Sequence, residues 1–280
     1  MMSPSSFFFY FLPVRSGLTG ILFLLVGSFL VLNGCKSKSD DQPKPTNTDY
    51  QVVIRLNAKA NGAPVLMDRT WFVNPNQDSV LARSFSFFIS NIKLTDTITG
   101  ATWSEADSYH LVNFVTDSSY VNLKLKGVPQ SGKFNRLSYA IGVDQAANSS
   151  SAFLGKGDLV QGTGMDWNWT DGWKFLLLEG RFKDVSANTK GDLVYHIGFN
   201  NNYRSVNRSL ARVGDLVPTK GSRQILNADV NLPQLFTGNP LVDVATNNNE
   251  MGNNAFTNKI ADNYASNGFI QLVSLQQQNF

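Results

Sequence analysis

The 280-residue sequence has very little of the two side chains that most often carry metal and redox chemistry, because it contains one cysteine and two histidines. The single cysteine, Cys35, excludes disulfide bonds, thiolate zinc sites and cysteine nucleophiles in the chain that follows it. The two histidines, His110 and His196, form no H-E-x-x-H pair, and the sequence has no G-x-S-x-G motif. A hydrolase is therefore the least favoured class of function.

An excess of charge of one sign is also absent. The chain has 24 basic and 21 acidic residues, a formal balance of +3, and removal of residues 1–34 takes away only Arg15 and leaves +2. The basic residues are scattered among acidic ones, whereas a nucleic-acid-binding protein clusters them. We therefore expect no nucleic-acid partner.

The N-terminal segment has the pattern of an export signal. Arg15 precedes an apolar run over residues 18–32, which is too short for a confident membrane-spanning helix. The run ends in LNGC at residues 32–35, which resembles a bacterial lipobox. We expect a signal peptide over residues 1–34 and a lipid anchor on Cys35 that attaches the protein to a membrane. Since Lys36 rather than aspartate follows the cysteine, the outer membrane is the expected location, at its periplasmic face or the cell surface.

Residues 35–48 are polar, contain proline and show no periodicity, which predicts a flexible tether before a domain over residues 49–280. This domain shows short segments of alternating hydrophobicity separated by turn residues, a pattern typical of strands. One amphipathic segment, 255–264, is predicted to be helical. The predicted fold is all-β, a β-sandwich of antiparallel strands with long loops and a short C-terminal helix. The predicted strands cover residues 50–56, 85–94, 109–114, 121–125, 134–143, 175–181, 193–199 and 222–230.

Both histidines follow a tyrosine and precede an aliphatic residue within a predicted strand. Alternation assigns Leu193, Tyr195, Ile197 and Phe199 to the buried face, so His196 is expected on the opposite face, where it is free to serve a surface or pocket site. Spacing alone leaves two interpretations open for His110 and His196: ordinary sheet residues bonded to neighbouring groups, or ligands.

Three of the five tryptophans lie within residues 167–173. They are either packing anchors or, with Trp167 and Trp169 exposed, a platform for sugar rings, which makes a surface glycan- or protein-binding module the alternative function. The acidic residues near the histidines and tryptophans are expected to cap turns or face solvent rather than to act in catalysis. These acidic residues are Asp107, Asp144, Asp166, Asp171 and Glu179.

The order of seven short segments resembles the MbnP-like proteins, periplasmic copper-binding proteins that are associated with methanobactin operons and widespread as lipoproteins. The resemblance covers most of the mature chain. Its segments are FISNI at 88–92, YHLV at 109–112, GVP at 127–129, IGVD at 141–144, GMDWNW at 164–169 with GWKF at 172–175, LEG at 178–180 and YHIG at 195–198.

The resemblance implies a non-catalytic protein that holds copper through His110 and His196. It also implies that Trp167 or Trp169 is oxidised to kynurenine by a partner di-haem enzyme of the cytochrome c peroxidase class. Two histidines form an incomplete site, so a third ligand is required, and the candidates are kynurenine, the Met165 thioether, a carboxylate or water. A thioether such as that of Met165 suits Cu(I). Two departures bear on the ligand set: the chain has NNNEM at 247–251 where the family is expected to carry a further histidine or methionine segment, and Trp173 stands where a tyrosine is expected.

Overall fold

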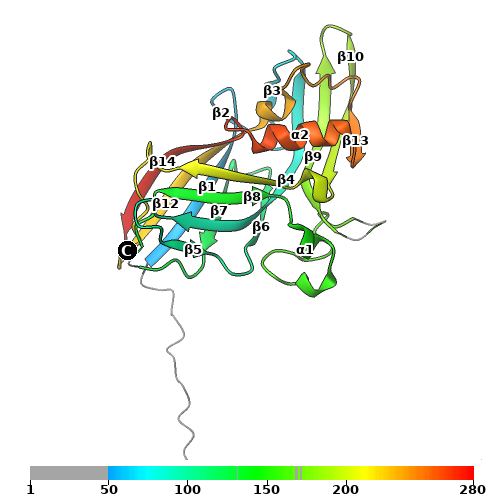
Figure 1. Cartoon of the computed structure of the whole chain (residues 1–280). Helices are drawn as coiled ribbons and strands as arrows, with labels where there is room; N and C mark the ends of the chain where they lie inside the picture. The colour runs from blue at the N-terminus through cyan, green and yellow to red at the C-terminus, as the bar shows by residue number, and fades with distance from the viewer. Residues whose placement is uncertain (1–49, 131, 168–169, 171) are drawn as a thin grey trace, which may run out of the picture. The chain divides into compact units, whose positions relative to one another are not determined.

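The computed structural model describes residues 50–130, 132–167, 170 and 172–280. The predicted signal peptide over 1–34, the lipidated Cys35, the tether over 35–48 and Trp169 lie outside the described residues. The described chain forms two β-sheets with short helices beside them (Figure 1).

The smaller sheet has five strands. Its order is β14 (Ile270–Asn279), β12 (Ser222–Asn231), β1 (Tyr50–Ala60) and β2 (Ala63–Pro64), and β7 (Tyr120–Leu125) also pairs with β1. Strands β1 and β12 run parallel, and the other pairs are antiparallel.

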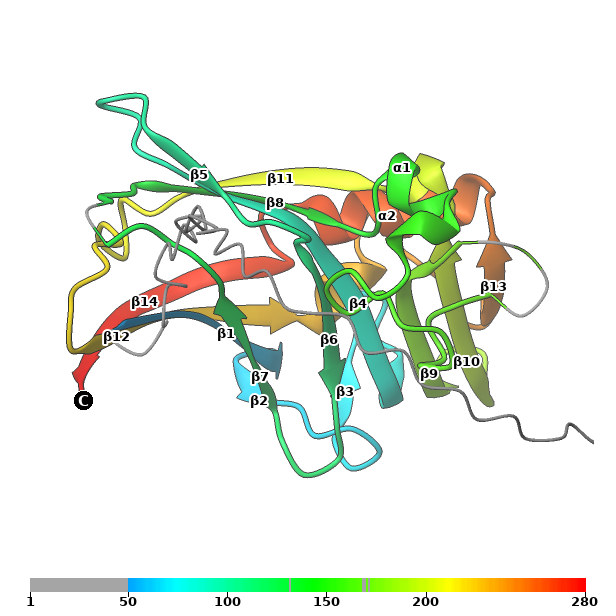
Figure 2. The same cartoon turned by 90° about the horizontal axis from the view of Figure 1, so that it is seen from below.

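The larger sheet has nine strands arranged around the 17-residue strand β4 (Ser79–Thr95). Its main path is β11 (Arg204–Ser209), β8 (Arg136–Ile141), β4, β9 (Lys174–Asp184), β10 (Thr189–Gly198) and β13 (Asn249–Gly252). Three further strands, β3 (Trp71–Val73), β5 (Thr102–Ser104) and β6 (Tyr109–Phe114), pair with β4. Figure 2 shows β6, β4, β9 and β10 following one another across this sheet.

The main hydrophobic core lies between the two sheets, because alternate residues of both contribute to one buried cluster that includes Leu56, Phe87, Ile89, Leu176 and Ile197. We call the side of the nine-stranded sheet that faces this cluster its inner face, and the other side its outer face. This arrangement confirms the predicted all-β sandwich.

A second, smaller cluster covers part of the outer face. Residues 143–167 fold over this face with α1 (Gln145–Asn148) and η1 (Ser151–Phe153), and together with Trp173 they bury side chains against β4 and β9. The members of this outer cluster are Phe88, Tyr109, Val143, Ala147, Leu159, Met165, Trp173 and Phe175.

The predicted C-terminal helix is α2 (Ala255–Ala265), which begins with a capping box formed by Asn254 and Thr257. It buries Ile260, Ala261 and Tyr264 in the main core. Two 3-10 turns, η2 (Asn200–Asn202) and η3 (Leu232–Phe236), pack against it. Neither helix of the described chain combines the length and the hydropathy that crossing a bilayer requires.

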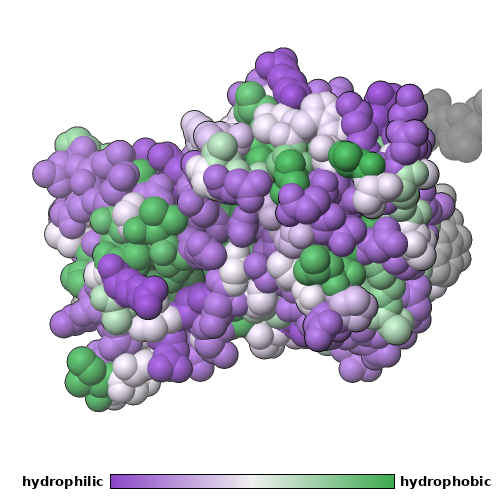
Figure 3. All heavy atoms as spheres, turned by 90° about the horizontal axis from the view of Figure 1, so that it is seen from above, coloured by the Kyte–Doolittle hydropathy of each residue, from purple (hydrophilic) through white to green (hydrophobic). Residues whose placement is uncertain are grey.

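All eight predicted strand segments form strands, although their ends differ from the prediction by up to six residues, the largest difference being at the start of β4. The strands that the sequence did not predict include β11, β13 and β14, which are the outermost strands of their sheets. An outermost strand buries few side chains: β14 buries only Ile270 and β11 only Val206. Such strands lack clear alternation in the sequence because much of their surface faces water. Figure 3 shows the molecular surface seen from above, which is mostly hydrophilic, with hydrophobic side chains in separate groups.

Candidate functional site

The two histidines lie on opposite faces of the nine-stranded sheet. His110 in β6 pairs with Ile89 of β4, a residue of the main core, so its side chain starts from the inner face. His196 in β10 pairs with Leu177 of β9, which pairs with Ser86 of β4, so its side chain starts from the outer face. The strand order β6, β4, β9, β10 also separates them by three strand spacings, or about 14 Å. The structure therefore does not bring the two predicted imidazole ligands together around one ion.

His110 joins the two sheets through a buried carboxylate. Its Nε2 lies 2.5 Å from Oε2 of Glu105, whose side chain is 2% exposed. Glu105 also accepts hydrogen bonds from the Ser108 hydroxyl at 3.0 Å and from the amide of Lys126, directly after β7, at 3.0 Å. A cavity of about 270 Å³ between β6 and β7 borders this pair.

Burial by itself would raise the pKa of Glu105, but the hydrogen bond and charge of His110, with the amide and the hydroxyl, outweigh burial and hold the pKa below its usual value. The carboxylate is therefore ionised at neutral pH, and His110 donates to it. These contacts give His110 a structural role, because it links the two sheets through Glu105.

His196 has the surroundings of a ligand. Its Nε2 lies 2.7 Å from Oε1 of Glu179, one strand away, and its side chain is 13% exposed. Burial lowers the pKa of His196, and the charge of Lys174 acts in the same direction, so the upward effect of Glu179 does not prevail. The imidazole is therefore neutral at neutral pH. Because the carboxylate accepts the Nε2 proton, Nδ1 is the nitrogen that carries the lone pair.

Trp167 covers the His196 ring from the side. The two ring centroids are 6.4 Å apart with the planes at 65°, and the indole is 7% exposed. Lys174 Nζ lies 5.4 Å from the indole centroid and donates hydrogen bonds to the carbonyl oxygens of Gly164 and Asp166. The lysine thus ties the tryptophan loop to β9 beside His196.

Met251 is the neighbour of His196 on the other side. Strand β13 pairs with β10 in parallel, with Met251 directly opposite His196, and Met251 is 43% exposed. It belongs to segment 247–251, where the sequence departs from the pattern expected of the family. The thioether was missed because the pairing of β13 with β10 is not visible in the sequence.

The other predicted site residues have different positions. Met165 is buried in the outer cluster with Trp173 and Phe175, where it packs as a core residue. Trp169 and Asp171 lie outside the described residues. Trp167 and Trp173 are 7% and 4% exposed, so these two do not form an exposed platform for sugars.

Among the acidic residues, Asp144 caps α1 as expected, by accepting from the Ala147 amide. Asp166 accepts a hydrogen bond from the amide of Gly162 and so braces its own turn. Glu179 is a partly solvated charge that also accepts a hydrogen bond from His196 and so orients the imidazole. Only the register of β9 against β10 shows this role.

The end of β10 is strained next to this site. Phe199 has φ +67° and ψ 148°, a combination that is nearly restricted to glycine and costs about 1–3 kcal/mol in other residues. Its ring centroid lies 5.5 Å from that of Trp167. The preceding residue must be glycine, since a Cβ on Gly198 would come within 2.7 Å of Trp167 Cζ2 and 2.6 Å of the Trp173 carbonyl oxygen.

The described residues contain no group of three or more His, Cys, Asp or Glu side chains arranged to hold a metal ion. The outer-face site offers instead one oriented imidazole, one thioether in register with it and an indole that packs against the imidazole. We call His196, Glu179, Trp167, Met251 and Lys174 the outer-face site. Soft and borderline donors of this kind suit copper better than the hard cations Mg²⁺ and Ca²⁺.

Comparison with known proteins gave two findings. A family model described as MbnP matches residues 49–255. Among solved structures, MbnP from Methylosinus trichosporium is similar to this chain, with 15% sequence identity, a TM-score of 0.43, and coverage of 66% of this chain and 76% of that chain. Comparison with curated proteins gave no match.

Proposed function

We propose that this chain, which belongs to the MbnP family by the match over residues 49–255, binds copper in the cell envelope. The proposed site is at His196, on the outer face of the nine-stranded sheet. The family membership predicted from the sequence is confirmed by that match. The observation that carries the proposal is the contact of 2.7 Å between His196 Nε2 and Glu179 Oε1. A carboxylate on one imidazole nitrogen fixes the ring and raises the basicity of the other nitrogen, an arrangement common among metal-binding histidines.

The residues around His196 fit copper in both oxidation states. Nδ1 of the neutral imidazole provides a ligand for Cu(I) or Cu(II), and the Met251 thioether adds a soft donor that favours Cu(I). The buried Trp167 ring excludes water from one side of the imidazole. Bound copper would supply a tightly held ion for storage or delivery, and we assign the protein no catalytic step.

Two features that the family resemblance implies belong to the same proposal. Trp167, rather than Trp169, is the tryptophan that we propose for conversion to kynurenine by a di-haem partner, because its indole lies against His196. The lipid anchor on Cys35 would hold the domain at the outer membrane, within reach of such a partner. Intact mass of the protein isolated from its native envelope tests both modifications.

The proposal is tested by copper titration against a colorimetric Cu(I) chelator, with metal content measured in parallel. We expect near-stoichiometric copper in the wild-type protein and its loss in His196→Ala. His110→Ala is the matched control, because this histidine also follows a tyrosine, also binds a glutamate and lies on the other face. Equal loss in both variants would contradict a site at His196, and absence of copper from the wild-type protein would contradict the function itself.

A further inference from the structure

The turn that follows β10 holds an unfavourable backbone conformation within three residues of His196. Phe199 is the only aromatic residue among the seven described non-glycine residues with positive φ, and the other six are Asn, Asp or Gln. Asparagine and aspartate adopt this region with little penalty, whereas a bulky side chain does not. A phenylalanine can keep this conformation only where contacts with neighbouring residues hold it.

Asn202 enforces the conformation. Its amide N–H donates to the Phe199 carbonyl oxygen at 2.9 Å, and its side-chain Nδ2 donates to the Gly198 carbonyl oxygen at 2.6 Å. The side chain of Asn202 is fully buried. Asn202 thus fixes both peptide groups that flank Phe199, the one before it and the one after it.

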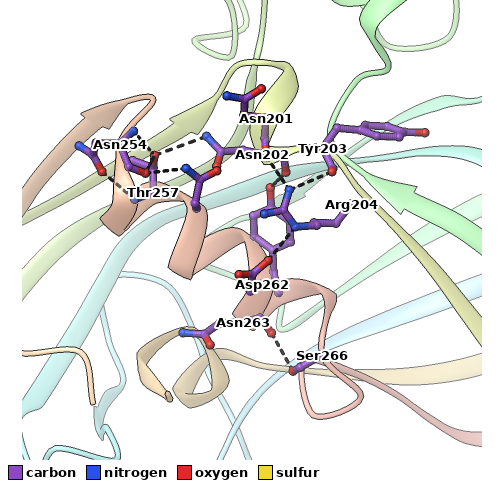
Figure 4. A network of polar contacts seen from close by, with 11 residues as sticks. Asn201, Asn202, Tyr203, Arg204, Asn254, Thr257, Asp262, Asn263 and Ser266 are labelled. Atoms are coloured by element: carbon purple, nitrogen blue, oxygen red, sulfur yellow. Dashed lines mark hydrogen bonds and ion pairs between the residues drawn. The ribbon is translucent and has the colours of Figure 1, made fainter. Parts of the chain in front are cut away.

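Helix α2 in turn holds Asn202. The Asn202 Nδ2 lies 3.5 Å from the Thr257 hydroxyl, and the Tyr264 hydroxyl donates to the Asn202 carbonyl oxygen. Thr257 is a member of the capping box at the start of α2. Figure 4 shows Asn202 between the turn and the helix, with Asn254 and Thr257 at the start of the helix beside it.

The enforced conformation directs the Phe199 ring onto Trp167. The two ring centroids are 5.5 Å apart at 35°, while His196 contacts the indole at 6.4 Å and 65°. The backbone of Gly198 also lies against the indole, because even a methyl group there would collide with it. The indole therefore contacts Phe199, Gly198 and His196, with Lys174 over its ring, while it borders a cavity of about 410 Å³ into which it could shift if one of these contacts were lost.

We propose that Phe199 is a positioning residue of the outer-face site: its strained backbone, held by α2 through Asn202, keeps its ring against Trp167 and thereby fixes the indole beside His196. The inference rests on the proposed copper site for its functional meaning. The placement of Trp167 by Phe199 is a property of the metal-free protein and is measured without copper.

A role in packing alone and a positioning role predict different effects of Phe199→Gly. Glycine adopts the observed φ and ψ without penalty, so the substitution relieves strain while it removes the ring. Strain relief offsets the lost ring contacts whichever role the ring has, so stability is expected to be retained in both cases. If the ring only filled space, Trp167 and the site would stay unchanged. If it positions the indole, Trp167 loosens and copper is held less tightly.

The experiment uses the full chain labelled with 5-fluorotryptophan, in which Trp167→Phe identifies the ¹⁹F resonance of Trp167. Metal-free Phe199→Gly is expected to shift and broaden this resonance without a lower melting temperature, and Cu(I) affinity is expected to fall about tenfold, as for other residues that orient a metal site. Gln77→Gly is the control, because Gln77 is exposed, has φ +66° and lies in the turn before β4. It should change neither measurement.

Each outcome decides the question. An unchanged Trp167 resonance in Phe199→Gly overturns the proposal, whatever the copper result. A changed resonance with unchanged Cu(I) affinity overturns the link to the site. If the wild-type protein binds no copper, the proposed function fails while the resonance still reports whether Phe199 positions the indole. Should Phe199→Gly not fold, Phe199→Leu, which keeps an apolar side chain but loses the ring contact, is expected to show a smaller shift of the same resonance, and no shift would overturn the proposal.

Discussion

His110 and His196 start from opposite faces of the same sheet, and each donates Nε2–H to a glutamate on its own face. The difference between them is the burial of the acidic partner. The Glu105 side chain is 2% exposed and joins β6 to the end of β7, while the Glu179 side chain is 42% exposed. The two histidine side chains are equally exposed, at 14% and 13%, so the pairs differ in what the carboxylate does: Glu105 links the two sheets, whereas Glu179 is open to water.

His110→Ala should therefore destabilise the fold more than His196→Ala does. Loss of His110 leaves a buried carboxylate short of one partner, which costs about 2–3 kcal/mol in the free energy of unfolding. Loss of His196 leaves a glutamate that water can solvate, at a cost of less than about 1 kcal/mol. Urea denaturation of the metal-free variants measures both values, and an equal loss would show that His110 does not join the sheets.

The carboxylate of Glu105 should also make stability depend on pH on the acid side. Its pKa is lower in the folded than in the unfolded chain, so the unfolded chain takes up the proton first as pH falls. The contribution is fully present above the ordinary value of 4.5 and is lost as pH decreases below it. The stability advantage of the wild-type protein over Glu105→Gln should shrink below pH 4.5. The exposed Asp192→Asn controls for general loss of negative charge.

Glu179→Gln should weaken copper binding without disturbing the fold. The amide oxygen still accepts from His196 Nε2, but the charge that raises the basicity of Nδ1 is gone, and affinity is expected to fall about tenfold or more. Chelator competition measures the change. Glu250→Gln is the control, since Glu250 precedes Met251 but pairs with Tyr195 rather than His196.

Met251→Leu should separate the two oxidation states of copper. The substitution keeps volume and hydrophobicity but removes the sulfur, which is a donor for Cu(I) and a poor one for Cu(II). We expect Cu(I) affinity to fall about tenfold, equivalent to about 1.4 kcal/mol, with Cu(II) affinity unchanged. A parallel decrease for both states would indicate that Met251 acts through packing and not as a ligand.

Gly198→Ala should displace Trp167. The added methyl group would lie 2.6 Å from the Trp173 carbonyl oxygen and 2.7 Å from the Trp167 indole, so these groups must move, at a cost of about 1–3 kcal/mol. The near-ultraviolet circular dichroism of the tryptophans should weaken. Gly191→Ala in the same strand is the milder comparison, because its methyl group would meet only the edge of the Phe182 ring at 3.0 Å.

The sequence by itself predicted the fold class, because buried strands leave a regular trace. Leu193, Tyr195 and Ile197 alternate with His196, and this alternation correctly placed the histidine on the face away from the main core. The same alternation wrongly placed Phe199 on the buried face, because β10 ends at Gly198 and the positive φ of Phe199 turns its ring onto Trp167. The amphipathic segment 255–264 likewise predicted α2. The family followed from the order of short segments and was confirmed by the match over residues 49–255.

The composition of the site was decided only by the tertiary structure. The two Tyr-His segments look equivalent in the sequence. Local periodicity shows which residues share one face of a strand, but it does not show whether that face lies on the inner or the outer side of the sheet. The pairing of His196 with Glu179 and Met251, and of His110 with Glu105, depends on the register between strands far apart in the chain. Register is fixed by the burial of whole strands against one another, so it cannot be predicted from any single residue. For this reason, the sequence determined that the chain is a β-sandwich of the MbnP family with two histidines, and the folded sheet decided that they serve different purposes.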